Sequence, residues 1–223
     1  MMLAIADVLN EVELAQAGSM LASAHWGDGR VTAGHQSAQV KNNLQLPQDG
    51  EEARALGEIV LRALERNALF VAAALPRHVY PPLFNRYAQG MSFGDHVDNA
   101  IRPLPGSPHR IRTDLSATLF LNAPEDYDGG ELSVEGGPGI KLSAGSMILY
   151  PSTSLHSVTQ VTRGARIACF FWVQSMVKDA GERKILFDLD RAIVALGGSG
   201  ANPAELARLT SVYHNLIRKW GEV

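Results

Sequence analysis

Three residues in the middle of the chain could bind one metal ion: His96 and Asp98 in SFGDHVDNA, and His156 in YPSTSLHSV. Side chains at positions i and i+2 of an extended segment point to the same face, so His96 and Asp98 can both reach one ion. Two imidazoles and one carboxylate on one face of an ion form the arrangement that holds non-haem Fe(II) and leaves other coordination positions open. The pattern therefore predicts an iron centre.

Arg166 lies ten residues after His156, in the segment RGARIACFFW, and could bind a carboxylate. Arginine is preferred where a carboxylate must be held by two parallel hydrogen bonds in a fixed, buried geometry. We predict that Arg166 binds the far carboxylate of a dicarboxylic keto acid. Tyr87, in FNRYAQG, could donate a phenolic hydrogen bond to the same carboxylate. A salt-bridged arginine at a strand end and a structural tyrosine are the alternatives.

Each part of this pattern also occurs by chance. An H-x-D sequence is common in a chain with seven histidines, and an isolated histidine more often lies at the surface or makes an ordinary hydrogen bond. The order of the motifs, the β-rich context and the later arginine favour the metal site. The remaining histidines, which have no carboxylate or imidazole at i+2 or i+4, are His25, His35, His78, His109 and His214.

Composition restricts the class of protein. A chain of 223 residues that is 46% hydrophobic can bury one good core. A net charge of −3, without basic clusters, gives no electrostatic footprint for nucleic acid or an anionic membrane. The single Cys169 rules out a disulfide framework and favours a reducing compartment. We find no signal-peptide pattern or membrane-length apolar run, and we predict a cytoplasmic protein.

Helical patterns occur at both ends of the chain. Apolar periodicity predicts a helix over residues 6–26. Asp49, followed three residues later by Glu52, resembles a capping box that opens a helix to about Glu65. After residue 178 the helical pattern returns, and a final helix is predicted from Asn202-Pro203 through Arg218.

Short β-type runs separated by Gly and Pro fill the region between these helices. They are LFVAAAL, LFNRYA, DLSATLFLN, GELSVEG, IKLSAGSMILYPS, HSVTQVT and ARIACFFWVQ. Many short strands at regular spacing predict a barrel or sandwich. The Pro- and Gly-rich segment IRPLPGSPHRIR predicts a flap over the site, and the paired glycines of YDGGEL predict a turn.

Other polar residues could contribute to the site. Arg112 and Asp114, in RIRTDLSATLF, could either line the pocket or form a structural ion pair. Lys41, together with Asn42 and Asn43, is a similar candidate on the N-terminal side. The sequence leaves these roles open. Trp172 could lie beside the site, although core packing is the more common role of such a residue.

Several segments resemble a known family. NRYAQGMSFGDHVD, DLSATLFLN, YDGGEL and LSAGSMILYPSTSLHSVTQVTRGARIACFFWVQS are similar to the Fe(II)/2-oxoglutarate dioxygenases of the prolyl 4-hydroxylase type. VTAGHQSAQVKNNLQL and ILFDLDRAI resemble, more narrowly, the bacterial PKHD-type hydroxylases, including the PiuC-like iron-uptake factors. The resemblance runs nearly from end to end.

The resemblance carries specific expectations. The family's iron ligands fall on His96, Asp98 and His156, its 2-oxoglutarate-binding basic residue falls on Arg166, and its assisting tyrosine falls on Tyr87. It implies Fe(II), 2-oxoglutarate and O2 as requirements, and L-ascorbate as a supporting reductant. It does not imply a particular substrate.

The expected fold is α+β, with a double-stranded β-helix (jelly-roll) core and flanking N-terminal and C-terminal helices. We predict a dioxygenase domain over residues 1–178, with its core at about 68–178, and a small helical extension over residues 179–223. The C-terminal segment could cover the core of its own chain or form a homo-oligomer interface.

The expected activity is hydroxylation of an unknown small-molecule or protein substrate, coupled to conversion of 2-oxoglutarate to succinate and CO2, with a link to iron uptake. Two alternatives stay open. One is a non-catalytic sensor that binds iron and 2-oxoglutarate. The other is a zinc hydrolase on a jelly roll, because His and Asp ligands accept several divalent metals. Neither alternative requires a cation at Arg166.

Overall fold

The computed structural model describes all residues, 1–223, and its centre is a β-core of two antiparallel sheets. The large sheet contains, in spatial order, β1 (Leu3–Ile5), β13 (Met147–Pro151), β10 (Leu115–Phe120), β15 (Arg163–Ser175), β6 (Leu83–Ala88), β4 (Leu44–Gln45) and β2 (Gly27–Asp28), and β5 (Pro76–Val79) and β11 (Tyr127–Asp128) also pair with β15. The small sheet contains β12 (Leu132–Val134), β14 (His156–Val158), β7 (Ser92–His96) and β3 (Lys41–Asn42). A pocket between the sheets is lined by residues of both.

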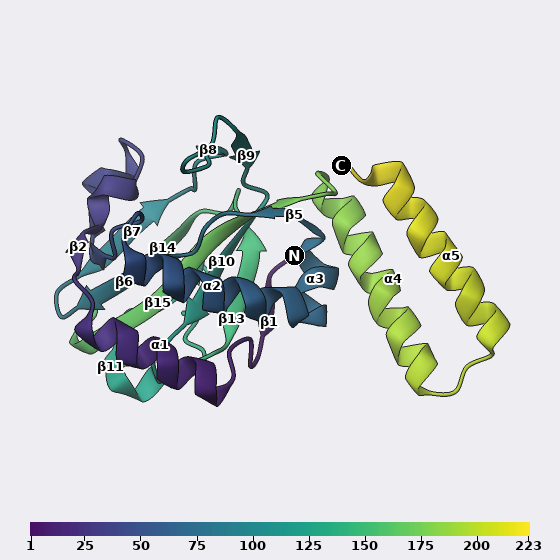
Figure 1. Cartoon of the computed structure of the whole chain (residues 1–223), viewed down its shortest axis with the longest axis horizontal. Coiled ribbons are helices and arrows are strands. Elements are labelled where there is room, and N and C mark those ends of the chain that lie inside the picture. The colour runs from purple at the N-terminus through teal and green to yellow at the C-terminus, as the bar shows by residue number, and fades with distance from the viewer.

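Five helices flank this core, mostly on the outer face of the large sheet (Figure 1). They are α1 (Glu11–Ser23), α2 (Glu51–Arg66), α3 (Ala68–Ala74), α4 (Ala180–Gly198) and α5 (Pro203–Trp220), and short 3-10 turns lie at Gly29–Thr32, Ser37–Gln39 and Pro124–Asp126. The α4–α5 hairpin lies to one side of the β-core, beyond α3 (Figure 1). No helix is both long and apolar enough to cross a membrane.

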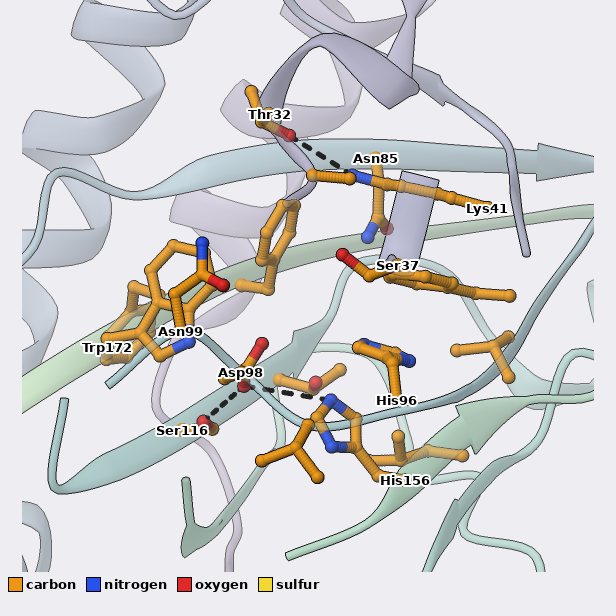
Figure 2. A pocket seen from close by; sticks show the side chains of 18 of the residues that line it. Thr32, Ser37, Lys41, Asn85, His96, Asp98, Asn99, Ser116, His156 and Trp172 are labelled. Atoms are coloured by element: carbon orange, nitrogen blue, oxygen red, sulfur yellow. Dashed lines mark hydrogen bonds and ion pairs between the residues drawn. The ribbon is translucent and has the colours of Figure 1, made fainter. Parts of the chain in front are cut away.

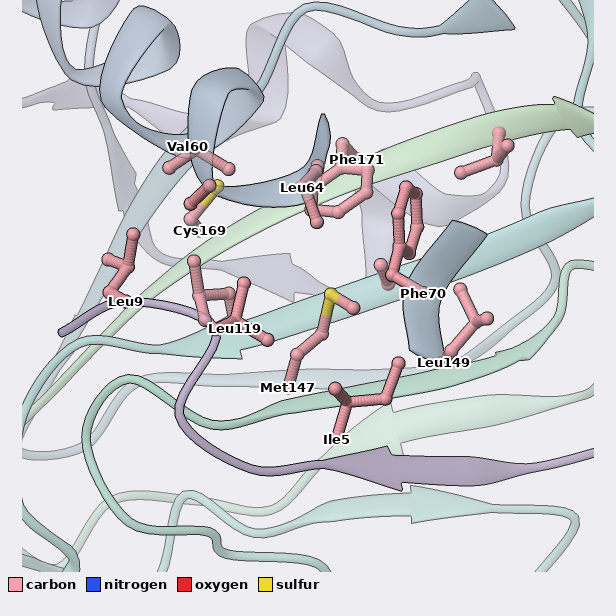
Figure 3. Close-up of a cluster of buried hydrophobic side chains, with 14 of the residues drawn as sticks. Ile5, Leu9, Val60, Leu64, Phe70, Leu119, Met147, Leu149, Cys169 and Phe171 are labelled. Atoms are coloured by element: carbon pink, nitrogen blue, oxygen red, sulfur yellow. The ribbon is translucent and has the colours of Figure 1, made fainter. Parts of the chain in front are cut away.

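Alternation along the central strands separates the core from the pocket. On β10, Ala117 and Leu119 belong to the main hydrophobic cluster with side chains of the helices, and the polar Ser116 and Thr118 line the pocket. This cluster also includes side chains of α1, α2 and α3 and the alternate residues Cys169 and Phe171 of β15 (Figure 3). Because side chains alternate between the two faces of a strand, the same strands that build the core also present polar groups to the pocket.

The N-terminal helices differ from their predicted starts. Residues 3–5 form an edge strand against β13, and Asp7 has a φ of 52°, so α1 begins only after Asn10. Asn10 Oδ1 accepts a hydrogen bond from Glu13 N, and Glu13 Oε2 accepts one from Asn10 N. The two bonds form a complete capping box. The capping box predicted at Asp49 is wrong, because Gly50 is the N-cap of α2 and makes no side-chain cap.

The segment LFVAAAL, predicted as a strand, is helix α3. Asn67 Oδ1 accepts a hydrogen bond from Phe70 N at its start, and Leu75 ends it in the left-handed conformation with a φ of 43°. Phe70 and the three following alanines at 72–74 are buried. A short apolar run that is buried has no amphipathic period, so sequence alone cannot distinguish a strand from a buried helix here.

The C-terminal helices were predicted correctly, and each begins at an ordinary N-cap. Asp179 Oδ1 accepts a hydrogen bond from Glu182 N, and Asn202 Oδ1 accepts one from Ala204 N just after the start of α5. The hairpin joins the rest of the chain through a small buried cluster that contains Leu75, Val177 and Leu186. Helix α5 itself has no buried residue.

Candidate metal and co-substrate site

His96, Asp98 and His156 converge in the pocket between the two sheets (Figure 2). His96 ends β7 and His156 begins β14, and these two residues are direct partners in the antiparallel pairing of the strands. Asp98 follows two residues after the end of β7. One potential ligand atom from each residue lies within 4.8 Å of the other two. This is the arrangement that the H-x-D spacing predicted, and it could hold a metal ion.

Backbone contacts orient both imidazoles. His96 Nδ1 lies 2.8 Å from Gly94 O, and His156 Nδ1 lies 3.0 Å from Ser154 O. A carbonyl can only accept, so both Nδ1 atoms act as donors, and Nε2 is the atom of each ring that is available to a metal ion. Burial, and then the neighbouring His156, lower the pKa of His96 to about 4. Neutral imidazoles that are fixed through one nitrogen are suited to metal binding.

A pair of serine hydroxyls orients the carboxylate. Ser116 Oγ donates a hydrogen bond to Asp98 Oδ2 at 2.6 Å and lies 2.8 Å from Ser152 Oγ. The same Asp98 oxygen lies 3.7 Å from His156 Nε2. These serines are not among the site residues predicted from the sequence. The signal was available, because Ser116 and Thr118 are polar residues at alternate positions of an otherwise apolar strand.

Arg166 is a buried cation without a counter-ion. Its side chain is 1% exposed, Nη1 lies 3.4 Å from Asn85 Oδ1, and Nε has no hydrogen-bond partner. No carboxylate of the chain lies within ion-pair distance of it. The guanidinium carbon lies 5.3 Å from the centre of the Tyr87 ring and 5.4 Å from that of Phe120. A buried, unpaired charge is costly, so this position favours binding of an anion.

Two buried tyrosines lie near this cation. Tyr87 is the strand partner of Arg166, lines the pocket and is 1% exposed. Burial raises the pKa of Tyr87 to about 12, so its phenol stays protonated and can donate a hydrogen bond. Tyr127 is fully buried and its hydroxyl has no partner. It lies in the YDGGEL segment, for which the sequence predicts only a turn.

The glycines of that segment serve both the turn and the site. Gly129 and Gly130 have φ values of 70° and 63°, which confirms the predicted turn role. A Cβ atom on Gly130 would lie 3.2 Å from Arg166 Cδ and 3.1 Å from Tyr127 Cε2. The absence of a side chain at Gly130 therefore gives these two residues the space that they occupy.

The structure separates the remaining candidates. Lys41 lines the pocket, with Nζ donating to Thr32 Oγ1 at 3.1 Å. Arg112 and Asp114 do not line it. They form an ion pair, with Arg112 Nε 2.7 Å from Asp114 Oδ1, and Asp114 Oδ2 also accepts a hydrogen bond from Ser175 N. Their structural role was one of the two that the sequence left open.

The flap predicted over residues 101–112 is a two-stranded hairpin, β8 (Ile101–Pro103) and β9 (Arg110–Arg112). Arg112 is the last residue of β9. Its ion pairs with Asp114 and with Glu222, which lies 3.2 Å away near the C-terminus, hold this end of the hairpin. Arg102 extends from β8 into the pocket, where it lies over Trp172. The sequence pattern indicates Arg102 only as part of the flap, and Trp172 mainly as a core residue.

Comparison with known proteins places this geometry in a family. Residues 82–174 match the model of the 2OG-Fe(II) oxygenase superfamily, and residues 180–222 match the PKHD-type hydroxylase C-terminal domain. PKHD-type hydroxylases of Xanthomonas axonopodis pv. citri and Gluconobacter oxydans are 54% and 56% identical to the chain, each over 100% of both sequences. The chain belongs to the PKHD-type hydroxylase family. It is therefore an oxidoreductase of the Fe(II)/2-oxoglutarate oxygenase superfamily.

Solved structures share the fold at low sequence identity. A 2OG-Fe(II) oxygenase family oxidoreductase from Burkholderia pseudomallei aligns with a TM-score of 0.53 and 19% identity, covering 78% of this chain and 85% of that one. A prolyl hydroxylase from Trichoplax adhaerens, in complex with a hypoxia inducible factor peptide fragment, gives a TM-score of 0.53 and 15% identity, with coverage of 78% and 82%. The predicted α+β class with a jelly-roll core and flanking helices is confirmed.

Proposed function

We propose that this PKHD-type hydroxylase binds Fe(II) through His96, Asp98 and His156. The observation that carries the proposal is the convergence of the three ligand atoms within 4.8 Å of one another, with both Nδ1 atoms already hydrogen-bonded to backbone carbonyls. Two neutral nitrogens and one anionic oxygen fit Fe(II), and three ligands on one side leave positions for a co-substrate and O2.

Arg166 and Tyr87 are the proposed ligands of 2-oxoglutarate. The guanidinium of Arg166, which has no counter-ion, can bind one carboxylate of the co-substrate. The protonated phenol of Tyr87 can donate a further hydrogen bond to it. Tyr127, whose buried hydroxyl has no partner, is an additional donor for the same carboxylate. A dicarboxylic keto acid suits this arrangement because its second carboxylate can be held away from the metal ligands.

The proposed reaction converts 2-oxoglutarate, O2 and a C–H bond of the substrate into succinate, CO2 and a C–OH group. Bound Fe(II) and 2-oxoglutarate supply the oxidising chemistry, with L-ascorbate as a supporting reductant. The residues of this chain hold and orient the reactants. Ser116 fixes the Asp98 carboxylate, and the two sheets enclose the reacting centre and limit access of water.

Enzyme loaded with Fe(II) and 2-oxoglutarate under anaerobic conditions, and then exposed to O2 with a cell extract, tests this function. We expect succinate release that depends on O2 and is stimulated by the extract, together with a metabolite or peptide that gains the mass of one oxygen atom. A sensor would bind both ligands without extract-stimulated succinate release. A zinc hydrolase would act without O2. Either result would contradict the proposal.

Replacing Ser116 by alanine is expected to weaken Fe(II) binding by about 10- to 100-fold, the usual effect of removing a hydrogen bond to a metal ligand. The variant frees one oxygen of Asp98 to turn, because Ser116 Oγ is its hydrogen-bond donor at 2.6 Å. Competition with a coloured chelator measures the affinity. Ser133→Ala is the matched control, since its hydroxyl bonds only to Gly137 O on an exposed turn. Equal affinities of the two variants would exclude this role for Ser116.

Four further expectations from the sequence stay predictions. These are a cytoplasmic location, a link to iron uptake, a homo-oligomer, and the division into a dioxygenase domain (1–178) and a helical extension (179–223). The exposed α5 helix is available for contacts with another copy of the chain. Light scattering of the full chain would measure the oligomeric state.

A further inference from the structure

Two cations of the pocket lie apart from the proposed co-substrate site. Lys41 is 6% exposed, and its Nζ donates hydrogen bonds to Thr32 Oγ1 at 3.1 Å and Gln45 Oε1 at 3.3 Å. Arg102 comes from the β8–β9 hairpin, and its buried Nε has no hydrogen-bond partner. Both side chains line the same pocket as the metal-binding residues. Figure 2 shows Lys41 above His96, with its amine turned toward Thr32.

The positions of the cations follow one face of β15. Arg166, Phe170 and Trp172 lie on this face, because they are separated by even numbers of residues. Lys41 Nζ lies 5.7 Å from the centre of the Phe170 ring, and the guanidinium carbon of Arg102 lies 3.9 Å from that of Trp172. Phe170 is four residues beyond Arg166, which corresponds to about 13 Å along a strand. The two cations therefore form a second positive site, distinct from Arg166.

No carboxylate of the chain forms an ion pair with this second site. Neither Lys41 nor Arg102 has a carboxylate within 4.0 Å, and Asp98 is the only acidic residue that lines the pocket. Asp98 is already used in the proposed metal site. When Fe(II) and 2-oxoglutarate are bound, their two opposite double charges cancel, and the charge of Asp98 cancels that of Arg166. The positive charges of Lys41 and Arg102 are then left without a negative charge in the pocket.

Burial makes this imbalance significant. Lys41 lies near two aromatic rings, with Nζ 5.4 Å from the centre of Phe93 and 5.7 Å from that of Phe170. Burial, and then the charge of Arg102, lower the pKa of Lys41 to about 8, which indicates that the pocket disfavours its positive charge. A bound anion would relieve both effects.

We propose that Lys41 and Arg102 bind an anionic group, a carboxylate or a phosphate, of the substrate that is hydroxylated. This inference rests on the proposed function, because it names the substrate class of the same pocket. The anion would lie between the aromatic residues Phe93, Phe170 and Trp172, all of which line the pocket. The substrate is thus a small organic anion, or the anionic end of a larger molecule, and its anion places a nearby C–H bond at the metal site.

Calorimetric titration of the whole enzyme, with and without Fe(II) and 2-oxoglutarate and with O2 excluded, tests the proposal. The probes are phenylacetate, phenyl phosphate and the neutral phenylacetamide, which has nearly the same shape as phenylacetate. We expect at least one anion to bind about tenfold or more tightly than the amide, as charge-assisted hydrogen bonds require. The better anion distinguishes a carboxylate site from a phosphate site.

Variants assign the preference to these residues. In Lys41→Met and in Arg102→Gln, the preference for the anion is expected to fall below about threefold. Arg110→Gln is the matched control, because Arg110 is exposed on the same hairpin and is absent from the pocket. Thermal unfolding of each variant shows whether it is folded. If Lys41→Met does not fold, Arg102→Gln alone decides the result.

The outcomes separate this inference from the proposed function. Equal binding of phenylacetate and phenylacetamide, failure of both anions to bind at millimolar concentrations, or a preference that survives in both variants would overturn the anion site. Failure of the wild-type enzyme to bind 2-oxoglutarate in an Fe(II)-dependent manner would instead contradict the proposed function. The titrations without Fe(II) and 2-oxoglutarate would then still report on Lys41 and Arg102.

Discussion

Replacing Asp98 by alanine is expected to lower substrate-coupled 2-oxoglutarate turnover by at least about a thousandfold. Asp98 is the only anionic group of the proposed metal site, and its side chain is 13% exposed. Losing one member of a buried ionic contact costs about 4 kcal/mol, which corresponds to a factor of about a thousand. Steady-state succinate release measures the loss of turnover, and chelator competition measures the loss of Fe(II) affinity.

The variant should keep its fold. Ser116 Oγ loses its carboxylate acceptor but still has Ser152 Oγ at 2.8 Å, so no buried hydroxyl is left without a partner. Asp95→Ala is the matched control, because Asp95 lies on β7, three residues before Asp98, and is exposed. We expect this control to bind Fe(II) like the wild type. An Asp98→Ala enzyme with unchanged Fe(II) affinity and coupled turnover would exclude the proposed metal site.

The positions of the metal-binding residues could be predicted from sequence because the relevant signal is local. His96 and Asp98 are two residues apart, so an extended backbone alone brings their side chains to the same side. His156 is distant in sequence, and its position depends on the pairing of β14 with β7, where it faces His96 directly. The sequence indicated the residue type and order, but only the sheet register places the second imidazole.

The pocket walls were harder to predict because they depend on tertiary contacts. Arg102 was read only as part of a flap, and its role follows from the approach of the β8–β9 hairpin to Trp172 on β15. Ser116 is an ordinary polar residue in sequence, and its contact with Asp98 joins β10 to the segment after β7. Such contacts join residues that are far apart in the chain and leave little trace in a local pattern.

The errors in the fold have a similar physical origin. The segment 69–75 is short and apolar and so predicts a strand, but an Asn67 cap and the burial of Phe70 and residues 72–75 accompany a helix there. The first helix is predicted to start at residue 6, too early, because Val8 and Leu9 fit its apolar face, but they are buried in the main cluster ahead of the Asn10 cap. In both cases, burial against distant elements decided the local structure.

Replacing Arg166 by glutamine is expected to raise the dissociation constant for 2-oxoglutarate about 100-fold or more, while Fe(II) still binds. Removing one partner of a buried, hydrogen-bonded charge pair costs about 2–5 kcal/mol. Ligand-induced stabilisation shows the same effect. At a concentration 100 times the wild-type dissociation constant, 2-oxoglutarate stabilises the wild type by about 2.7 kcal/mol, but a variant with a 100-fold higher constant by only about 0.4 kcal/mol.

A keto acid without the far carboxylate identifies the group that Arg166 binds. The wild type should bind 2-oxoglutarate much more tightly than 2-oxovalerate, and this preference should largely disappear in Arg166→Gln, because the variant lacks the cation that recognises the second carboxylate. Arg163→Gln is the matched control, since Arg163 lies on the same strand but is exposed and pairs with Asp128. A preference that is equally strong in Arg166→Gln would show that another residue binds this carboxylate, and Tyr87 and Tyr127 would then be the next cases to test.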